Sequence, residues 1–411
     1  MTVRGAADPT DHAERPCPAC GACAASVLFA QRFRQIEGGS LLSGYDVVVC
    51  GRCGCGYADR IPLQAEFDRY YQALSKYEQR DQGGRETAPD RSRFRDIAAL
   101  VDRFLGRRDG HILEVGCASG GLLACLRDLG HQSLEGVDPS PYCASAAARL
   151  YGLSVQTGTL SEPIVPRAPC DMVVLVGVLE HLREVGAALQ SVRSLLVPAG
   201  RIYVEVPDAT RFAEFVDAPF QQFSLEHVGF FSPDSLRRTL RRSGFACVHL
   251  EQTQRPHTAN SVMPVLAAVF ERSDAGDAEP LPSDAATAQG LEAYVEASAA
   301  IEANLRLVLD GLTASREPFV VWGVGTHTAH LLETTTLGQG AIVAFVDSNT
   351  NVQGKELAGR PIHAPEWLRT RSEPVLISSC VFQNEIAHEI RTRLGCPNRM
   401  VLLYPGAQGC A

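Results

Sequence analysis

Short apolar runs alternate with helix-like stretches through the middle of the chain. The first run, His111–Val115, is followed by apolar positions with helical spacing from Leu122 to Leu129. A second helical stretch covers Pro141–Leu150. Strands that are continuously apolar and separated by helices are typical of a parallel sheet that is buried on both faces. The pattern therefore predicts an α/β core whose strands lie in four runs: His111–Val115, Ser133–Val137, Met172–Val176 and Arg201–Val206.

A second set of such elements follows near the C-terminus. A strand, a glycine turn and a helix begin at Phe319, and two further strands are predicted over Ala341–Val346 and Pro374–Ser378. They indicate a second Rossmann-like unit. Ahead of them, apolar residues with helical spacing predict a helix that packs against a neighbouring domain. These residues are Leu291, Tyr294, Val295, Ile301, Leu305, Val308 and Leu312.

Composition marks the boundaries between these regions. Cysteines cluster before residue 56, and the polar stretch Glu78–Arg95 leads from this cluster into the core. The stretch Glu271–Gln289 is acidic, contains proline and lacks large apolar side chains, as linkers do. We therefore predict a cysteine module over 1–75, a core domain over 76–255, a linker over 256–290 and a C-terminal domain over 291–411.

The charge and the apolar runs exclude several classes of function. A net charge of -9 disfavours nucleic acid and anionic membranes as partners. The first sixteen residues contain no apolar core, and the runs Met172–Leu179 and Ser261–Phe270 are shorter than the roughly 20 residues of a membrane helix. We expect a cytoplasmic protein whose cysteines stay reduced.

Six of the fourteen cysteines lie in one short N-terminal segment. Four of them form two C-x-x-C pairs, Cys17 with Cys20 and Cys50 with Cys53. Two such pairs on tight turns can supply four thiolates to a tetrahedral zinc ion. A closed site of this kind is structural and has no open position for chemistry. Two neighbouring thiols are alternative ligands, Cys23 and Cys55.

A glycine-rich turn follows the first core strand and precedes a helix. It reads EVGCASGG from Glu114 to Gly121, and Asp138 ends the next strand 22 residues after Gly116. Small residues at a helix start let a ligand approach the backbone amides, and a carboxylate at the end of the second strand can accept hydrogen bonds from ribose hydroxyls. The turn predicts a nucleoside-binding site.

The motifs in this order resemble those of the class I S-adenosylmethionine-dependent methyltransferases. EVGCASG matches the first family motif with Ala118 at the middle glycine, and VDPS, GTL and DMVVLVGVLEHL follow. The resemblance implies that S-adenosylmethionine is the cofactor, bordered at its methionine moiety by Gly116 and Gly120. It also implies that Asp138 holds the ribose and that Leu160 lies near adenine. Glu114 would either serve this site or cap the amides of the turn.

Methyl transfer to a group that carries a proton needs a base, and histidine is the usual one near neutral pH. Two histidines are candidates. His181 follows Glu180 at the end of a core strand, where open parallel sheets bind ligands. His227 follows Glu226 just before a helix that Ser232 is expected to cap.

The whole arrangement resembles the sugar C-methyltransferases of deoxysugar biosynthesis, which act on nucleotide-linked 4-keto sugars. The resemblance implies a small-molecule substrate of that class and a base that removes the proton beside the ketone, so that the enolate carbon takes the methyl group. Glu226 and His227 match the Glu-His pair of that family, whereas its tyrosine falls on Ser224 and another polar position on Leu225. Two alternatives are an O- or N-methyltransferase and a non-catalytic, zinc-stabilised scaffold.

The C-terminal unit contains a second glycine turn. It runs from Gly323 to Thr328, and Asp347 ends the next strand. A dehydrogenase site is one interpretation, but Thr328 replaces the third glycine of that motif. The resemblance implies instead that this unit helps to hold the sugar nucleotide. Candidate contacts, each with a purely structural alternative, are His327, Asp347 and Asn349.

Overall fold

The protein divides into two compact units. Unit 1 comprises Met1–Leu28, Val47–Phe212 and Glu226–Leu291, and unit 2 comprises Phe29–Asp46, Ala213–Leu225 and Glu292–Ala411. The computed structural model describes residues 13–37, 41–73, 86–258, 261–273 and 282–404.

The core of unit 1 is a seven-stranded sheet with the order β10-β11-β8-β7-β4-β5-β6. The strands from β8 to β6 are parallel, and β11 and β10 add an antiparallel edge. This confirms the predicted α/β core. The strands are β4 (Ile112–Val115), β5 (Leu134–Asp138), β6 (Val155–Thr157), β7 (Cys170–Val176), β8 (Leu196–Pro207), β10 (Phe245–Thr258) and β11 (Ser261–Arg272).

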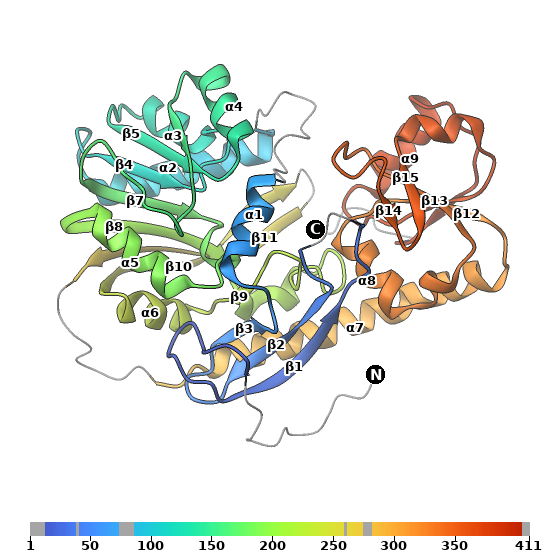
Figure 1. Cartoon of the computed structure of the whole chain (residues 1–411), viewed down its shortest axis with the longest axis horizontal. Helices are drawn as coiled ribbons and strands as arrows, with labels where there is room; N and C mark the ends of the chain where they lie inside the picture. Colours follow the sequence, from blue (N-terminus) through green and yellow to red (C-terminus); the bar gives the residue numbers. More distant parts are fainter. Residues whose placement is uncertain (1–12, 38–40, 74–85, 259–260, 274–281, 405–411) are drawn as a thin grey trace. The chain divides into compact units, whose positions relative to one another are not determined.

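Helices cover both faces of this sheet (Figure 1). They do so because the strands direct apolar side chains to both faces, where two hydrophobic clusters form. Val173 of β7 packs with α5 and α6, whereas Val174 packs with α2 and α3. Side-chain oxygens of Thr87, Ser140 and Ser232 accept amide hydrogens at the starts of α2, α4 and α6. The helices are α1 (Gln64–Ala73), α2 (Ala88–Leu105), α3 (Gly121–Asp128), α4 (Pro141–Tyr151), α5 (Val185–Leu195) and α6 (Pro233–Arg242), and the short 3-10 helices are η1 (Leu179–His181) and η2 (Ala209–Glu214).

The predicted linker over 256–290 is wrong at both ends. Its first part is β11, which pairs with β8 on one side and β10 on the other. The run Val265–Phe270 is buried, and its residues alternate between the hydrophobic clusters on the two faces of the sheet, so it belongs to the core. At its other end, α7 already begins at Ala285. The most acidic part of the stretch, residues 274–281, lies outside the described residues.

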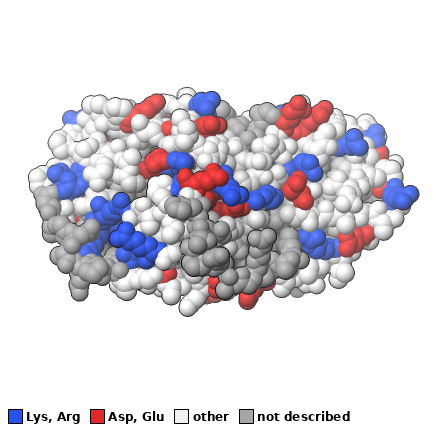
Figure 2. All heavy atoms as spheres, turned by 60° about the horizontal axis from the view of Figure 1, so that its bottom comes forward, with Lys and Arg blue, Asp and Glu red and all other residues white. Residues whose placement is uncertain are grey.

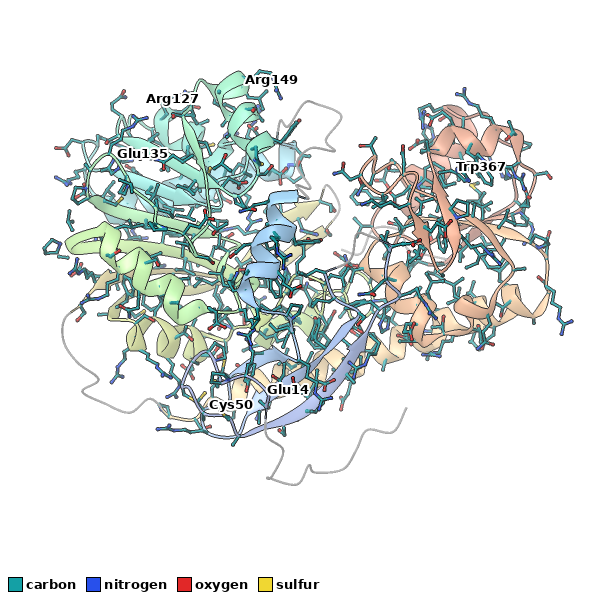
Figure 3. The ribbon with its side chains drawn as sticks, in the orientation of Figure 1. Glu14, Cys50, Arg127, Glu135, Arg149 and Trp367 are labelled. Carbon is teal, nitrogen blue, oxygen red and sulfur yellow. The ribbon has the colours of Figure 1, made fainter. Side chains whose placement is uncertain are left out.

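A four-stranded sheet with the order β1-β2-β3-β9 contains the N-terminal strands. Its last strand, β9, comes from far along the chain. It pairs antiparallel with β3, with Gly56 opposite Phe230. Glu14 and Cys50, both labelled in Figure 3, belong to this N-terminal region. The strands are β1 (Ala25–Arg32), β2 (Gly44–Cys50), β3 (Gly56–Asp59) and β9 (Gly229–Phe230).

Unit 2 contains a six-stranded sheet with the order β14-β15-β13-β12-β16-β17. All neighbours are parallel except β14 and β15, so the second predicted α/β unit is confirmed. Alternate residues of β12 again face separate hydrophobic clusters. The elements are α7 (Ala285–Ala314), β12 (Phe319–Trp322), α8 (Thr326–Thr334), η3 (Thr336–Gln339), β13 (Ile342–Val346), β14 (Glu356–Leu357), β15 (Arg360–His363), η4 (Pro365–Thr370), β16 (Val375–Ile377), α9 (Gln383–Thr392) and β17 (Met400–Leu402).

Within the described part of the chain, none of the helices is both long enough and apolar enough to cross a bilayer. On the face shown in Figure 2, acidic and basic side chains are interspersed among uncharged ones and do not form one extended patch of a single sign.

Candidate functional site

The glycine turn after β4 adopts left-handed backbone conformations at three positions. The φ angles are 77° at Gly116, 48° at Ala118 and 82° at Gly120. A Cβ atom on Gly116 would lie 2.7 Å from the Val178 side chain, so the turn has no room for one there. Ala118 tolerates its conformation at a cost of roughly 1 to 2 kcal/mol, which the surrounding hydrogen bonds must offset.

Asp138 holds this turn closed. Its carboxylate accepts the Ala118 amide at 2.8 Å and the Ser140 amide at 2.9 Å. Burial raises the pKa of Asp138, and the two amides oppose that rise. The side chain therefore fixes both the turn and the start of α4, and it still borders the neighbouring cavity.

A second carboxyl group, that of Glu114, lies beside Asp138. Burial, and secondarily the nearby Asp138 charge, raise the pKa of Glu114 to about 8. Its side chain is therefore largely neutral at pH 7. Glu114 is almost fully buried and does not line the cavity.

A cavity of about 180 Å³ opens at the carboxyl ends of the strands of unit 1. Three of the predicted cofactor residues, Gly116, Asp138 and Leu160, line it. Glu114, Ala118 and Gly120 shape the turn behind it. The other lining residues are Gln64, Asp68, Tyr71, Val115, Pro139, Ser140, Gly158, Thr159, Val176, Gly177, Val178, His181, Leu182 and Glu226.

The sequence places Tyr70 and Tyr71 before the core, where they could close over the cofactor, but it does not place Gln64 or Asp68 in this cavity. Gln64, Asp68 and Tyr71 come from α1, which precedes the core and its motifs. Their spacing of four and three residues puts them on one face of a helix, and this spacing is the signal that could have revealed them. Nothing in that spacing indicates which part of the chain the face would contact.

Of the two candidate histidines, His181 lines the cavity, and His227, which does not, packs against His181. The ring centroids of His181 and His227 are 5.0 Å apart at an interplanar angle of 71°. Glu180 completes the group, since its carboxylate and the two imidazoles have nitrogen and oxygen atoms within 4.8 Å of one another. Residues 46 positions apart in the chain therefore form one polar cluster.

Two tyrosines of α1 contact His181 of this cluster and Glu226, the residue before His227. The Tyr70 hydroxyl donates to Glu226 Oε1 at 3.1 Å, and the Tyr71 hydroxyl lies 2.9 Å from His181 Nδ1. Burial raises the pKa of both phenols, so they remain protonated at neutral pH. His181 Nδ1 also lies 3.1 Å from the Glu226 carbonyl. A carbonyl only accepts, so this contact favours the tautomer whose proton is on Nδ1 and whose Nε2 is basic.

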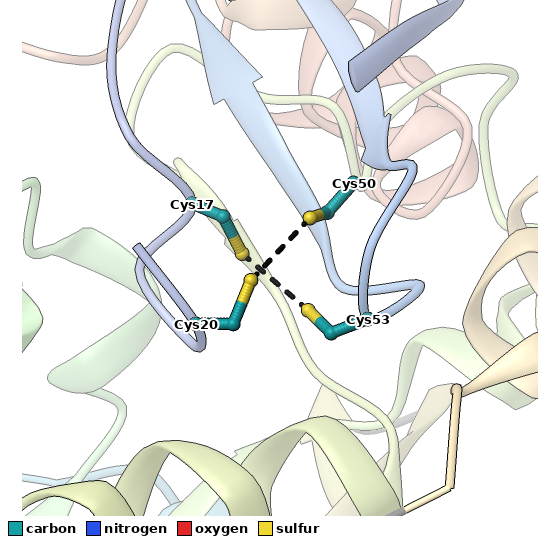
Figure 4. A group of neighbouring side chains, drawn as sticks. All are labelled: Cys17, Cys20, Cys50 and Cys53. Atoms are coloured by element: carbon teal, nitrogen blue, oxygen red, sulfur yellow. Dashed lines mark hydrogen bonds between the residues drawn. The ribbon is translucent and has the colours of Figure 1, made fainter. Parts of the chain in front are cut away.

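The four predicted zinc ligands lie in a second cluster of unit 1 (Figure 4). The sulfur atoms of Cys17 and Cys53 are 3.6 Å apart, as are those of Cys20 and Cys50. A tetrahedron of thiolates around zinc, with Zn–S bonds near 2.3 Å, has sulfur–sulfur edges of about 3.8 Å. The donor set and its spacing therefore fit zinc. Cys23 and Cys55 do not belong to this group.

The second glycine turn, in unit 2, repeats the hydrogen bonds of the first. Asp347 accepts the Val324 amide at 2.9 Å and the Asn349 amide at 2.8 Å, as Asp138 does with its own turn. His327 is buried, its Nε2 lies 2.7 Å from the Tyr404 hydroxyl, and burial lowers the pKa of His327 to about 3. These side chains all have structural partners inside unit 2.

The core of unit 1 defines a class of protein. Residues 90–250 match the family model of methyltransferase domains. With the glycine turn, Asp138 and the cavity at the strand ends, the match makes this chain a class I S-adenosylmethionine-dependent methyltransferase. It is therefore an enzyme, and the scaffold interpretation is set aside.

Curated relatives agree with this class. The chain is 26% identical over 347 residues to the C-methyltransferase NovU of Streptomyces niveus, a match that covers 80% of this chain and 78% of that protein. It is 32% identical over 142 residues to the ubiquinone biosynthesis O-methyltransferase of Bradyrhizobium diazoefficiens, covering 31% of this chain and 55% of that protein.

Solved structures similar to this chain include the 1,6-didemethyltoxoflavin-N1-methyltransferase of Burkholderia thailandensis with bound S-adenosylhomocysteine. That match has a TM-score of 0.41 at 21% identity and covers 55% of this chain and 97% of the other.

Proposed function

We propose that this enzyme methylates a carbon atom of a nucleotide-linked keto sugar in glycan or secondary-metabolite biosynthesis. The observation that carries the proposal is the His181–His227 pair beside the cofactor cavity, because an acceptor C–H bond needs a base where an already nucleophilic amine does not. The similarity to NovU, which is named a C-methyltransferase and matches most of this chain, supports it.

In this mechanism His227 removes the proton from the carbon beside the ketone. When bound, S-adenosylmethionine supplies the electrophilic methyl group. Gly116, Asp138 and Leu160 position the cofactor, and the walls of the cavity restrict access of water to the enolate. Glu226, held by Tyr70, keeps the His227 segment in place, and His181 is the second candidate for the base.

We also propose that Cys17, Cys20, Cys50 and Cys53 bind one structural zinc ion. The four thiols are the natural donor set for this ion, and a site with four protein ligands leaves no position for substrate. Zinc would therefore stabilise the module without taking part in methyl transfer.

O- or N-methylation is the second candidate function. Ser224 and Leu225 stand where the sugar C-methyltransferases carry polar residues, which removes a group that could polarise a ketone. The similarity of the core to an O-methyltransferase of ubiquinone biosynthesis also favours this candidate. It requires no exchange of a carbon-bound proton.

Mass spectrometry of reactions with a panel of nucleotide-linked 4-keto sugars tests the proposal. We expect a gain of one methyl group on at least one of them. In deuterium oxide and without cofactor, that acceptor should also take up deuterium at the methylated carbon. Methylation without deuterium uptake would favour the O- or N-methyl function, and no methylation of any keto sugar would contradict the substrate class.

A further inference from the structure

Val228, the residue after His227, connects the His227 segment to the cysteine module by hydrogen bonds. The Val228 amide donates to the Glu180 carbonyl at 2.7 Å. The Val228 carbonyl accepts the Ala58 amide of β3 at 3.0 Å and lies 3.5 Å from Nη2 of Arg15. The backbone after His227 is therefore held by groups from three separate parts of unit 1.

Arg15 lies between the cysteine module and both histidine segments. Its side chain is buried, and its guanidinium stacks on Tyr57, with 5.2 Å between its central carbon and the ring centroid. One Nη atom contacts the Val228 carbonyl, and the other lies 3.5 Å from the carbonyl of Arg183, two residues after His181. A buried cation needs such partners, so its position and theirs depend on each other.

The backbone of Arg15 is fixed from the module side. The amides of Glu14 and Arg15 both donate to the Asp59 carboxylate, at 2.9 and 3.1 Å. Cys17 follows two residues later, and its amide donates to the Ala22 carbonyl at 2.8 Å within the first cysteine turn. Movement of that turn would therefore move Arg15.

The second cysteine turn is linked through Asp284 to the same segment further along. The Asp284 amide donates to the Cys53 carbonyl at 2.9 Å, and the Asp284 carboxylate accepts the Ser232 hydroxyl at 2.5 Å. Ser232 caps α6, the helix that follows β9. A Cβ on Gly54 would lie only 1.8 Å from the Asp284 carbonyl, so the contact is close. Both cysteine turns thus hold the chain between His227 and α6.

The hydrophobic core of the cysteine module is small and rich in cysteine. It consists of Cys17, Ala19, Ala25, Val48, Cys50, Cys53, Cys55 and Tyr57, so half of its buried residues are cysteines. A core this small stabilises little by apolar burial, and clusters of this kind usually order only when metal is bound.

We infer that the metal-bound cysteine module positions the His181–His227 pair, and that Arg15 is the positioning residue that connects the module to the two histidine segments. The inference rests on the proposed function, in which these histidines supply the base. It differs from a purely stabilising role because it predicts a local effect on the histidine segments while the cofactor cavity stays intact.

Hydrogen exchange on the full chain tests the inference without any substrate. We expect that stripping the metal with a chelator speeds amide exchange of residues 228–230 by at least tenfold, while S-adenosylhomocysteine affinity stays within about twofold. Unchanged exchange after the metal has left would overturn the inference. Loss of cofactor binding together with faster exchange throughout unit 1 would also overturn it, because the module would then act as a general stabiliser.

An arginine substitution tests the transmitting residue, with a matched control in the same module. Arg15→Met should keep one metal ion per chain and the affinity for S-adenosylhomocysteine, but lower kcat by roughly tenfold or more with little change in KM for the cofactor. Arg52→Met, at an exposed arginine beside Cys53, should leave all four quantities unchanged. An unaltered kcat in Arg15→Met would contradict the role of Arg15.

The two experiments separate failure of this inference from failure of the proposed function. If no keto sugar is methylated but exchange at residues 228–230 still rises on metal removal, the coupling stands and the substrate class is wrong. If methylation occurs and metal removal leaves that exchange unchanged, the function stands and the coupling is wrong.

Discussion

Two carboxyl groups of the glycine turn show how local contacts decide charge at the scale of single residues. Asp138 accepts two backbone amides, which favour its ionised form. Among the described residues, Glu114 Oε2 has no hydrogen-bond partner, and burial keeps this carboxyl largely protonated. The sequence predicted both residues as parts of the site, but it could not predict this difference, because it depends on which amides point at each group.

Glu114→Gln tests this charge state through the pH dependence of stability. The folded-state pKa of about 8 lies above the ordinary value of about 4.3, so the unfolded chain releases this proton first as the pH rises. Glu114 should therefore lower the free energy of unfolding between about pH 4.5 and 8, by at most about 1.4 kcal/mol per pH unit. Denaturant unfolding at several pH values should show that Glu114→Gln gains stability relative to the wild type as the pH rises. A constant difference would contradict the account.

His227→Ala tests the assignment of the base. We expect kcat to fall by roughly 100-fold or more while the affinity for S-adenosylhomocysteine is unchanged, because the base acts on the acceptor and not on the cofactor. His181→Ala, measured in parallel, shows whether the second imidazole is the base instead. His249→Ala is the control, since this histidine lies on β10, packs on Phe104 and is not part of the Glu180–His181–His227 group. Full activity of His227→Ala would remove it from the mechanism.

At the scale of elements, the sequence predicts features that depend on a few adjacent residues. It does not predict which segments pair or pack with one another. The glycine turn, the C-x-x-C pairs and the Ser232 cap each lie within a few residues, and the structure has them where the sequence placed them. Strand β11 and the last residues of β10 were taken for a linker because composition does not reveal a strand's partners. The contributions of Gln64 and Asp68 of α1 to the cavity were missed for the same reason.

Gly116→Ala tests the fit between the turn after β4 and the cavity. An added methyl group would meet the Val178 side chain at 2.7 Å on a backbone with φ of 77°. We expect the turn to shift and the S-adenosylhomocysteine dissociation constant to rise at least tenfold in a calorimetric titration. Gly186→Ala is the matched control, because nothing lies within 4 Å of the added atom. Equal affinity of the two variants would show that the turn does not contact the cofactor.

At the scale of the whole molecule, the same device occurs twice. Asp138 in unit 1 and Asp347 in unit 2 each close a glycine turn with two amide hydrogen bonds. The first turn borders the cavity described above. At the second turn, the side chain of His327 is buried and its Nε2 lies within hydrogen-bond distance of the Tyr404 hydroxyl. Fold alone therefore does not identify a cofactor site, and the side chains around each turn decide its function.

Calorimetric titration of the purified chain with S-adenosylhomocysteine tests the central claim most directly. We predict one bound molecule per chain, a marked loss of affinity in Asp138→Asn, and unchanged affinity in Asp347→Asn, which alters the equivalent carboxylate of unit 2. No binding to the wild-type chain at millimolar ligand, or equal loss of affinity in both variants, would contradict the assignment of the cofactor to the turn after β4.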